Sequence, residues 1–160
     1  MARTREYLYS SERDVRKVSG PIIVLDGVQD VHNLGAVARV AEAAGAAAAV
    51  GKVSAGAVEH LRIARPESLV AFVHDARGGG CLAYGAVEDS GTDFREAGMN
   101  RQSIIVVGAE REGIRPRMRE VLDGLVIILM VGRVSSLNLS VACGILVFST
   151  REPPSGGADV

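Results

Sequence analysis

Uninterrupted apolar runs, rather than alternating apolar and polar residues, are the feature that most constrains how this chain can fold. A strand buried on both faces has a continuous apolar run, whereas a half-exposed strand alternates with a period of two. Runs of this kind, with one shorter extended piece at 61–64, cover residues 22–25, 46–50, 81–87, 104–107 and 125–130. Segments with helical spacing separate them. The sequence therefore predicts an α/β fold with a parallel sheet of about six strands and helices on both faces.

Segments with the apolar spacing or the boundary residues of helices lie between these runs. They cover residues 34–45, 54–60, 66–77, 116–123 and 138–150. Gly45 is a natural C-cap, and Pro66 and Pro116 suit the first turn of a helix. Residues 89–101 are predicted to form a loop.

The length of 160 residues suits one domain. Residues 1–20 are charged and predict an N-terminal tail, although a short helix stays open for them. Residues 21–151 are expected to form the whole folded domain. Residues 152–160 contain two prolines and two glycines and are expected to be a flexible tail.

Composition excludes several classes of protein. Hydrophobic residues make up 48% of the chain, but no apolar run approaches the roughly 20 residues of a membrane span. The first six residues include three charged side chains and lack the apolar centre of a signal peptide. Cys81 and Cys143 lie in apolar segments, so buried free thiols and a cytoplasmic location are expected. The three histidines are scattered, and no metal site is predicted.

The net charge of −1 argues against a protein that coats nucleic acid through bulk charge. A local basic patch is still possible on this composition. Four arginines lie close together after one of the apolar runs, at Arg111, Arg115, Arg117 and Arg119. Contact with RNA phosphates and ordinary solvated surface are equally good interpretations of this group.

Polar clusters follow three of the predicted strands, at residues 26–39, 108–119 and 130–140. Ligands of open α/β sheets bind at the carboxyl ends of the strands, so these clusters are expected to converge on a single site. In the last cluster, Ser136, Asn138 and Ser140 stand where packing alone would favour hydrocarbon. Buried polar groups are costly unless they are hydrogen-bonded, which indicates a ligand or a loop held in one shape.

Several residues of the first two clusters have more than one interpretation. Asn33 could cap the following helix. Arg39 could be a solvated side chain paired with Glu42, and His32 could be a base or an incidental loop residue. The glycines of 108–113 permit close approach of a ligand, but the segment is neither a phosphate-binding loop nor a dinucleotide fingerprint. Its two carboxylates, Glu110 and Glu112, would suit a cationic or hydroxylated ligand.

The predicted last helix is apolar on nearly every face. Helices of this type are buried. In a protein of this size such burial indicates a subunit interface, and a central core helix is the alternative.

The three clusters, in this order and spacing, resemble the SpoU family of RNA ribose methyltransferases, in the knotted SPOUT class. The resemblance spans residues 22–150. The first motif is residues 26–39 (DGVQDVHNLGAVAR), the second is 107–114 (VGAEREGI), and the third is 128–132 (ILMVG) with 136–142 (SLNLSVA). Residues 52–57 and 134–138 look most like the branch that methylates a guanosine ribose in large-subunit ribosomal RNA. Departures from the family pattern are Val31 and Leu129 in place of proline, and a shorter connection between Val50 and Ser54.

The resemblance implies a C-terminal trefoil knot, S-adenosylmethionine as the cofactor, RNA as the substrate and a homodimer built on the knot helix. By matched position, the cofactor-binding residues are Gly108, Ile128, Met130, Gly132 and Leu137. The catalytic residues implied in the same way are Asn33, Arg39, Glu110, Ser136 and Asn138. Arg111, Arg115 and Arg117 are the expected RNA contacts.

The favoured function is therefore methyl transfer from S-adenosylmethionine to a ribose 2′-hydroxyl in structured RNA, with ribosomal RNA favoured over transfer RNA. An arginine has a pKa above about 12, so Arg39 is expected to position and to stabilise charge rather than to act as a base. A non-catalytic knotted dimer that binds RNA or cofactor is the main alternative. A nucleotide-binding α/β protein of another class is a third possibility, disfavoured because no phosphate loop is present.

Overall fold

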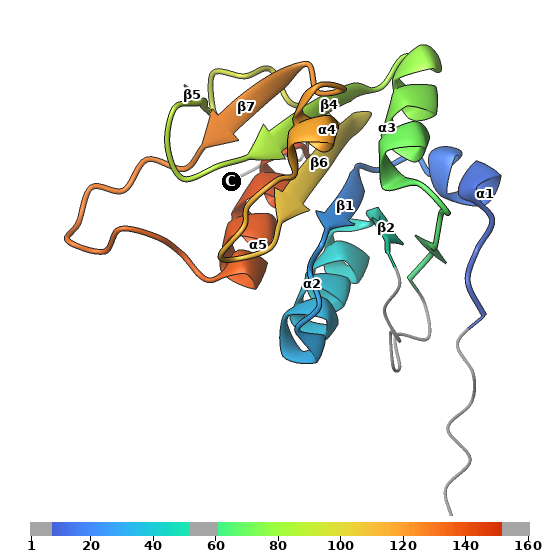
Figure 1. The fold of residues 1–160 in the computed structure, drawn as a ribbon, viewed down its shortest axis with the longest axis horizontal. Helices are drawn as coiled ribbons and strands as arrows, with labels where there is room; N and C mark the ends of the chain where they lie inside the picture. Colours follow the sequence, from blue (N-terminus) through green and yellow to red (C-terminus); the bar gives the residue numbers. More distant parts are fainter. Residues whose placement is uncertain (1–7, 52–60, 152–160) are drawn as a thin grey trace, which may run out of the picture.

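Seven parallel strands form the central sheet of the protein, as the computed structural model shows for residues 8–51 and 61–151 (Figure 1). The strands are β1 (Ile22–Asp26), β2 (Ala47–Val50), β3 (Ile63–Ala64), β4 (Leu82–Ala86), β5 (Thr92–Asp93), β6 (Ser103–Gly108) and β7 (Gly124–Ile127). Their order across the sheet is β3-β2-β1-β6-β4-β7-β5, and every neighbouring pair is parallel. The predicted parallel α/β architecture is confirmed.

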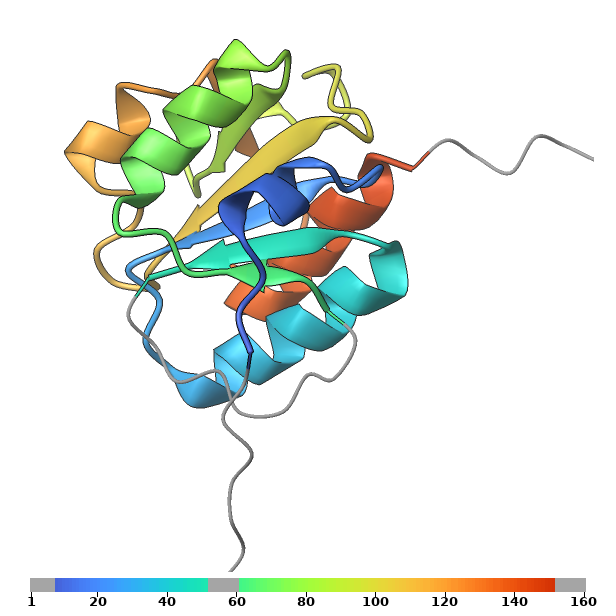
Figure 2. The ribbon, with the colours of Figure 1, turned by 90° about the vertical axis from the view of Figure 1, so that its right-hand side faces the viewer.

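Helices cover both faces of this sheet (Figure 2). One face packs against α2 (Val31–Ala44) and α5 (Leu139–Ser149), and the other packs against α1 (Glu12–Arg16), α3 (Leu69–Gly78) and α4 (Pro116–Arg119). Successive side chains of a strand alternate between these two cores: in β6, Ile105 and Val107 belong to the first, and Ile104 and Val106 to the second. Burial on both sides explains why the strands read as continuous apolar runs.

The start of α2 differs from the expected capping arrangement. Asp30, not Asn33, is the N-cap, and its side chain accepts hydrogen bonds from the main-chain N–H groups of His32 (2.8 Å) and Asn33 (3.1 Å). The helix therefore begins earlier than the sequence suggested, and Asn33 lies inside its first turn. Gly45 ends the helix with φ +68°, as predicted.

Other differences concern short or terminal segments. The predicted loop 89–101 contains β5, whose two residues are too few to show a periodic pattern and pair with Val126 and Ile127 of β7. Strand β7 ends at Ile127 rather than at residue 130, and α4 ends at Arg119 rather than near 123. Helix α3 begins after Ser68, whose hydroxyl caps it, rather than at Pro66. Helix α1 lies in the segment for which a tail or a short helix was expected, and its Val15 is fully buried.

Some predictions fall on residues that the structure does not describe. The expected helix 54–60 and the sequence run 52–57 lie outside the described residues, as do residues 1–7 and 152–160. Within the described part of the chain, no helix is long and apolar enough to cross a membrane. The threading of the last segment through a knot stays a prediction.

The two cysteines are both free, but only one is fully buried. Cys143 lies on the side of α5 that faces the protein core, and burial raises the pKa of its thiol to about 12. Cys81 precedes β4 and is partly exposed, so its predicted burial is wrong in degree. It lies at the turn between α3 and the sheet, where the chain is close to solvent.

One carboxylate ties three elements together at the amino ends of β4 and β7. Asp123 accepts hydrogen bonds from Nε of Arg77 (2.9 Å), at the end of α3, and from the main-chain N–H of Ala83 (2.7 Å), in β4. Partial burial opposes ionisation of Asp123, but the bonds from Arg77 and Ala83 outweigh it and leave the pKa of this carboxyl below 3.8, its ordinary value. The ionised form is thus favoured in the folded protein.

Replacing Asp123 with asparagine is expected to lower the free energy of unfolding by about 1 kcal/mol at neutral pH, because charge-assisted bonds are lost at a partly exposed site. A carboxyl group whose pKa is lowered by folding stabilises the fold at pH values above its pKa in the unfolded chain. This contribution is lost as the pH falls through the pKa of the group in the folded protein. The gap between wild type and Asp123→Asn should therefore shrink from about pH 7 to about pH 3 in urea titrations. The exposed Glu67→Gln serves as the control. A gap that stays constant over this range would contradict the assignment.

Candidate active site

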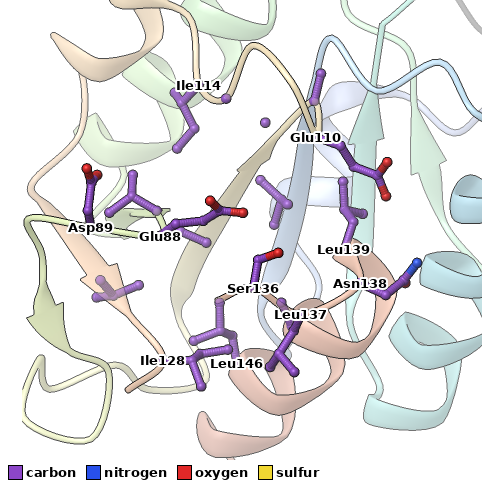
Figure 3. Close-up of a pocket in the computed structure, with 18 of the residues that line it drawn as sticks. Glu88, Asp89, Glu110, Ile114, Ile128, Ser136, Leu137, Asn138, Leu139 and Leu146 are labelled. Carbon is purple, nitrogen blue, oxygen red and sulfur yellow. The ribbon is translucent and has the colours of Figure 1, made fainter. Parts of the chain in front are cut away.

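A cavity of about 540 Å³ opens at the carboxyl ends of β4, β6 and β7 (Figure 3). These strands are neighbours or lie one strand apart in the sheet, so their following segments meet at one edge. The cavity is lined by residues 86–89 after β4, residues 107–114 at the end of β6 and beyond, and residues from 126 to 146 that include the start of α5. The position agrees with the general rule for ligands of open α/β sheets.

The floor of the cavity is apolar. It is formed by Val107, Val126, Ile128, Leu137, Leu139 and Leu146. Ile128, Leu137 and Leu146 lie together along one side of the close-up (Figure 3). A surface of this kind suits an aromatic ring or a hydrocarbon chain, because binding removes apolar area from water.

Charged side chains surround this floor, and acids outnumber bases among them. The carboxylates are Glu88, Asp89, Glu110 and Glu112, whereas the guanidinium groups are those of Arg111 and Arg119. Glu88 extends its carboxylate toward the middle of the cavity (Figure 3). The rim therefore favours a ligand that carries positive charge or donates hydrogen bonds from hydroxyl groups.

The loop after β6 is a tight closed turn. Gly113 has φ +65° and donates its main-chain N–H to the carbonyl of Ala109 (2.8 Å). Gly108 packs so closely against this turn that a Cβ on it would lie 2.1 Å from the carbonyl carbon of Gly113. Only glycine fits there, which explains the first glycine of this motif.

A chain of side-chain contacts joins the three polar clusters. Nδ2 of Asn33 in α2 donates to Oε1 of Glu110 (3.1 Å), and Nδ2 of Asn138 makes a longer bond of 3.5 Å to Oδ1 of Asn33. Oδ1 of Asn138 also caps α5, where it accepts from the main-chain N–H (2.9 Å) and the hydroxyl (2.6 Å) of Ser140. The expected convergence of the three clusters is therefore observed.

Most residues expected at the site from the sequence line the cavity. These are Gly108, Glu110, Arg111, Ile128, Met130, Ser136, Leu137 and Asn138. Ser136 and Asn138 are exposed rather than buried. The argument from the cost of burying a polar group therefore does not explain why polar residues occupy these two positions. The cavity supplies another reason for polar side chains at this junction, because both residues line it.

Other predicted residues do not line the cavity. Arg39 is exposed on α2 and forms no hydrogen bond or ion pair with the residues that the structure describes, so the suggested pairing with Glu42 is wrong. Gly132 and Arg117 are exposed and lie outside the lining. Arg115 is bonded to the buried carboxylate of Asp26. Among residues 8–51 and 61–151, no three His, Cys, Asp or Glu residues are grouped to hold a metal ion.

One wall of the cavity escaped the sequence interpretation. Residues 86–89 contribute Glu88 and Asp89, and these two carboxylates directly follow the apolar run 81–87. The rule that pointed to the other clusters, polar residues at the carboxyl end of a parallel strand, applies to this segment as well. The sequence indicates this segment only weakly, because Glu88 and Asp89 are the only two polar residues that interrupt the apolar pattern there.

Two glycine substitutions test the geometry of the loop after β6. Gly108→Ala is expected to lower the free energy of unfolding by about 1–3 kcal/mol, because the new Cβ overlaps the main chain of Gly113. Gly132→Ala is the matched control, since nothing lies within 4 Å of its added Cβ, and it should change stability by less than about 0.5 kcal/mol. Urea denaturation measures both, and equal effects would contradict the tight packing of this turn.

Comparison with known proteins identifies the family. The model of the SpoU rRNA Methylase family matches residues 20–148. The 23S rRNA (guanosine-2′-O-)-methyltransferase RlmB of Vibrio cholerae is 39% identical over 140 residues, which are 79% of this chain and 57% of that protein. The RlmB protein of Ralstonia nicotianae is 38% identical over 146 residues, or 82% of this chain and 59% of the relative.

Solved structures agree with this assignment. The AdoMet-bound rRNA methyltransferase from Sinorhizobium meliloti superimposes with a TM-score of 0.78 at 27% identity, covering 90% of this chain and 60% of the other. The chain thus spans less than two thirds of the length of these relatives. On sequence and fold together, the chain belongs to the SpoU rRNA methylase family.

Proposed function

We propose that the chain transfers a methyl group from S-adenosylmethionine to a ribose 2′-hydroxyl in structured RNA, with ribosomal RNA favoured over transfer RNA. The observation that carries this proposal is the contact chain Glu110–Asn33–Asn138, which brings the three family motifs together beside one cavity. The printed activities of the Vibrio and Ralstonia relatives, guanosine 2′-O-methylation of 23S rRNA, support the same reaction type.

The cavity has the chemistry that S-adenosylmethionine requires. Its apolar floor, with Ile128 and Leu137, suits the adenine ring, and the volume of about 540 Å³ lies in the range of small-molecule sites. The carboxylates of Glu88 and Glu110 complement a positive sulfonium and can accept from ribose hydroxyls. Gly108 lacks a side chain, which lets the turn at Gly113 pack against it and shapes the wall of the cavity where we propose that the ligand binds. Met130 and Gly132 are further proposed contacts.

The bound cofactor supplies a methyl group that its sulfonium already activates. The task of the protein is then to hold the ribose hydroxyl in line with that group, and alignment alone contributes several kcal/mol to lowering a barrier. We assign this positioning to Asn33, Glu110, Ser136 and Asn138. Glu110 accepts a hydrogen bond from Asn33, which directs one of its carboxylate oxygens toward α2.

Arginines are proposed to contact the RNA. Arg39 and Arg117 are exposed and lack hydrogen-bond or ion-pair partners among the described residues, and Arg111 lies at the cavity. The guanidinium of Arg39 would hold the ribose or an adjacent phosphate, which is the charge stabilisation assigned to it from the sequence. A cytoplasmic location fits this substrate and the two unpaired thiols.

A homodimer built on α5 completes the proposal. Val141, Ile145 and Phe148 are 50%, 36% and 43% exposed and recur at helical spacing. The opposite side of the helix, with Cys143 and Leu146, is buried in the core. An apolar stripe on the outer face of an otherwise buried helix is the kind of surface that a second copy of the chain would cover.

The reaction itself is tested with the purified protein and ribosomal RNA. Titration calorimetry with S-adenosylmethionine should show binding, and mass mapping of the RNA after incubation should show a ribose 2′-O-methyl group at a discrete nucleotide. Binding without methylation of ribosomal or transfer RNA would favour the non-catalytic dimer instead. Absence of cofactor binding at millimolar concentration would contradict the proposal.

Substitution of Arg39 tests its role in the reaction. Arg39→Lys keeps the positive charge but loses the planar fork, so the methylation rate is expected to fall about 10- to 100-fold while cofactor affinity is unchanged. Single-turnover methylation and calorimetry measure the two quantities. Arg101→Lys, at an exposed position before β6, is the matched control. Wild-type methylation by Arg39→Lys would remove this residue from the site.

The oligomeric state is tested on the outer face of α5. Ile145→Glu places a charge in the proposed interface and is expected to convert the dimer to a monomer, because a buried unpaired charge is strongly unfavourable. Leu82→Glu is the control, since Leu82 is 44% exposed at the start of β4. Sedimentation velocity measures the mass, and a dimer that survives Ile145→Glu would place the interface elsewhere.

A further inference from the structure

Asp26 is a fully buried carboxylate that the proposed reaction does not use. It ends β1, and its side chain is 0% exposed. Three donors satisfy it, all from Arg115: the main-chain N–H (2.9 Å), Nε (2.7 Å) and Nη2 (2.5 Å). A buried carboxylate without such donors would be very unfavourable, so Asp26 requires Arg115.

The location of this pair relates it to the cavity. Asp26 lies opposite Gly108 in the pairing of β1 with β6, and Gly108 is where the loop after β6 begins. Arg115 is the residue that follows Ile114, the last residue of that loop to line the cavity. Both ends of the loop are thus fixed to Asp26, one through strand pairing and the other through the ion pair.

The loop between these two ends behaves as one unit. Its turn is closed by the bond from Gly113 to Ala109, and Gly108 packs against Gly113. A shift of Arg115 away from Asp26 would therefore move the whole turn, including Glu110. Glu110 meets Asn33, which lies on α2 a few residues after Asp26 along the chain. The Asp26–Arg115 pair therefore joins the two segments that carry Asn33 and Glu110.

From this arrangement we propose that Asp26 and Arg115 are positioning residues that hold the loop 108–114 in the shape needed for cofactor binding. The inference rests on the proposed function of the cavity and gives Arg115 a role other than the RNA contact expected from sequence. The side chain of Arg115 is 56% exposed, but its Nε and Nη2 point to Asp26. The bonds to Asp26 also raise the pKa of Arg115, as expected for a charge held by its partner.

Four variants of the full chain test this role: Arg115→Gln, Arg115→Lys, Asp26→Asn and the double variant. Arg101→Gln is the matched control, since Arg101 is exposed in the turn before β6 and has no ion pair among the described residues. Arg115→Gln is expected to weaken S-adenosylmethionine binding about 10- to 100-fold, as small misplacements in a site do. The KM for RNA should stay at the wild-type value. Arg101→Gln should leave both the cofactor affinity and the KM for RNA unchanged.

Hydrogen exchange supplies a readout that does not depend on the reaction. The main-chain amides of Gly113 and Arg115 should exchange faster in Arg115→Gln, while those in β1 stay protected. Asp26→Asn and Arg115→Gln should combine less than additively, because each one removes the same interaction. Arg115→Lys keeps the charge but not the fork and should lie between wild type and Arg115→Gln, which keeps the test valid if the glutamine variant fails to fold.

A different pattern would overturn the inference. If Arg115→Gln raises the KM for RNA but leaves cofactor affinity and loop exchange unchanged, Arg115 is an RNA contact and the pair does not position the loop. If wild type binds no cofactor, the proposed function fails, and hydrogen exchange still shows separately whether the pair fixes the loop.

Discussion

Parallel pairing of β1 with β6 is the constraint on which the rest of the site depends. It aligns Asp26 with Gly108, so the segments that follow the two strands leave the sheet at the same edge. Asn33 and Glu110 are 77 residues apart in sequence, yet their side chains are bonded at 3.1 Å. No local preference of the chain could produce that contact. Burial of both strands on both faces stabilises their register, because a slip by one residue would exchange the two cores.

The cavity combines an apolar floor with an acidic rim. Its floor is hydrocarbon, with Val126 and Leu146 each 1% exposed, whereas its rim is rich in carboxylates. Acids close together on a loop repel one another, which works against a compact loop unless other contacts hold it. The turn closed by Gly113 and the bond from Asn33 to Glu110 are such contacts. The loop thus has a shape fixed by its main chain, and its charge is available to a cationic ligand.

Much of this arrangement could be predicted from the sequence, because it follows from apolar periodicity and from where polar residues interrupt it. The order of strands along the chain, the parallel sheet and the convergence of the clusters all belong to this class. What could not be predicted depends on contacts between distant segments. Strand β5 is defined by its pairing with the edge of β7, which its own two residues do not indicate. Similarly, the partner of Arg115 is a carboxylate that lies 89 residues away in sequence. Arg115 resembles its exposed neighbours in sequence, and only the fold shows that Asp26 is buried beside it.

Helix α5 connects the cavity with the surface proposed to bind a second copy. Asn138 caps its first turn at the cavity, and Leu139 and Leu146 contribute to the floor. Ile145, adjacent to Leu146 in sequence, lies on the exposed face. A helix moves as a rigid unit over this distance, so a partner packed on its outer face would also restrain the residues that line the cavity.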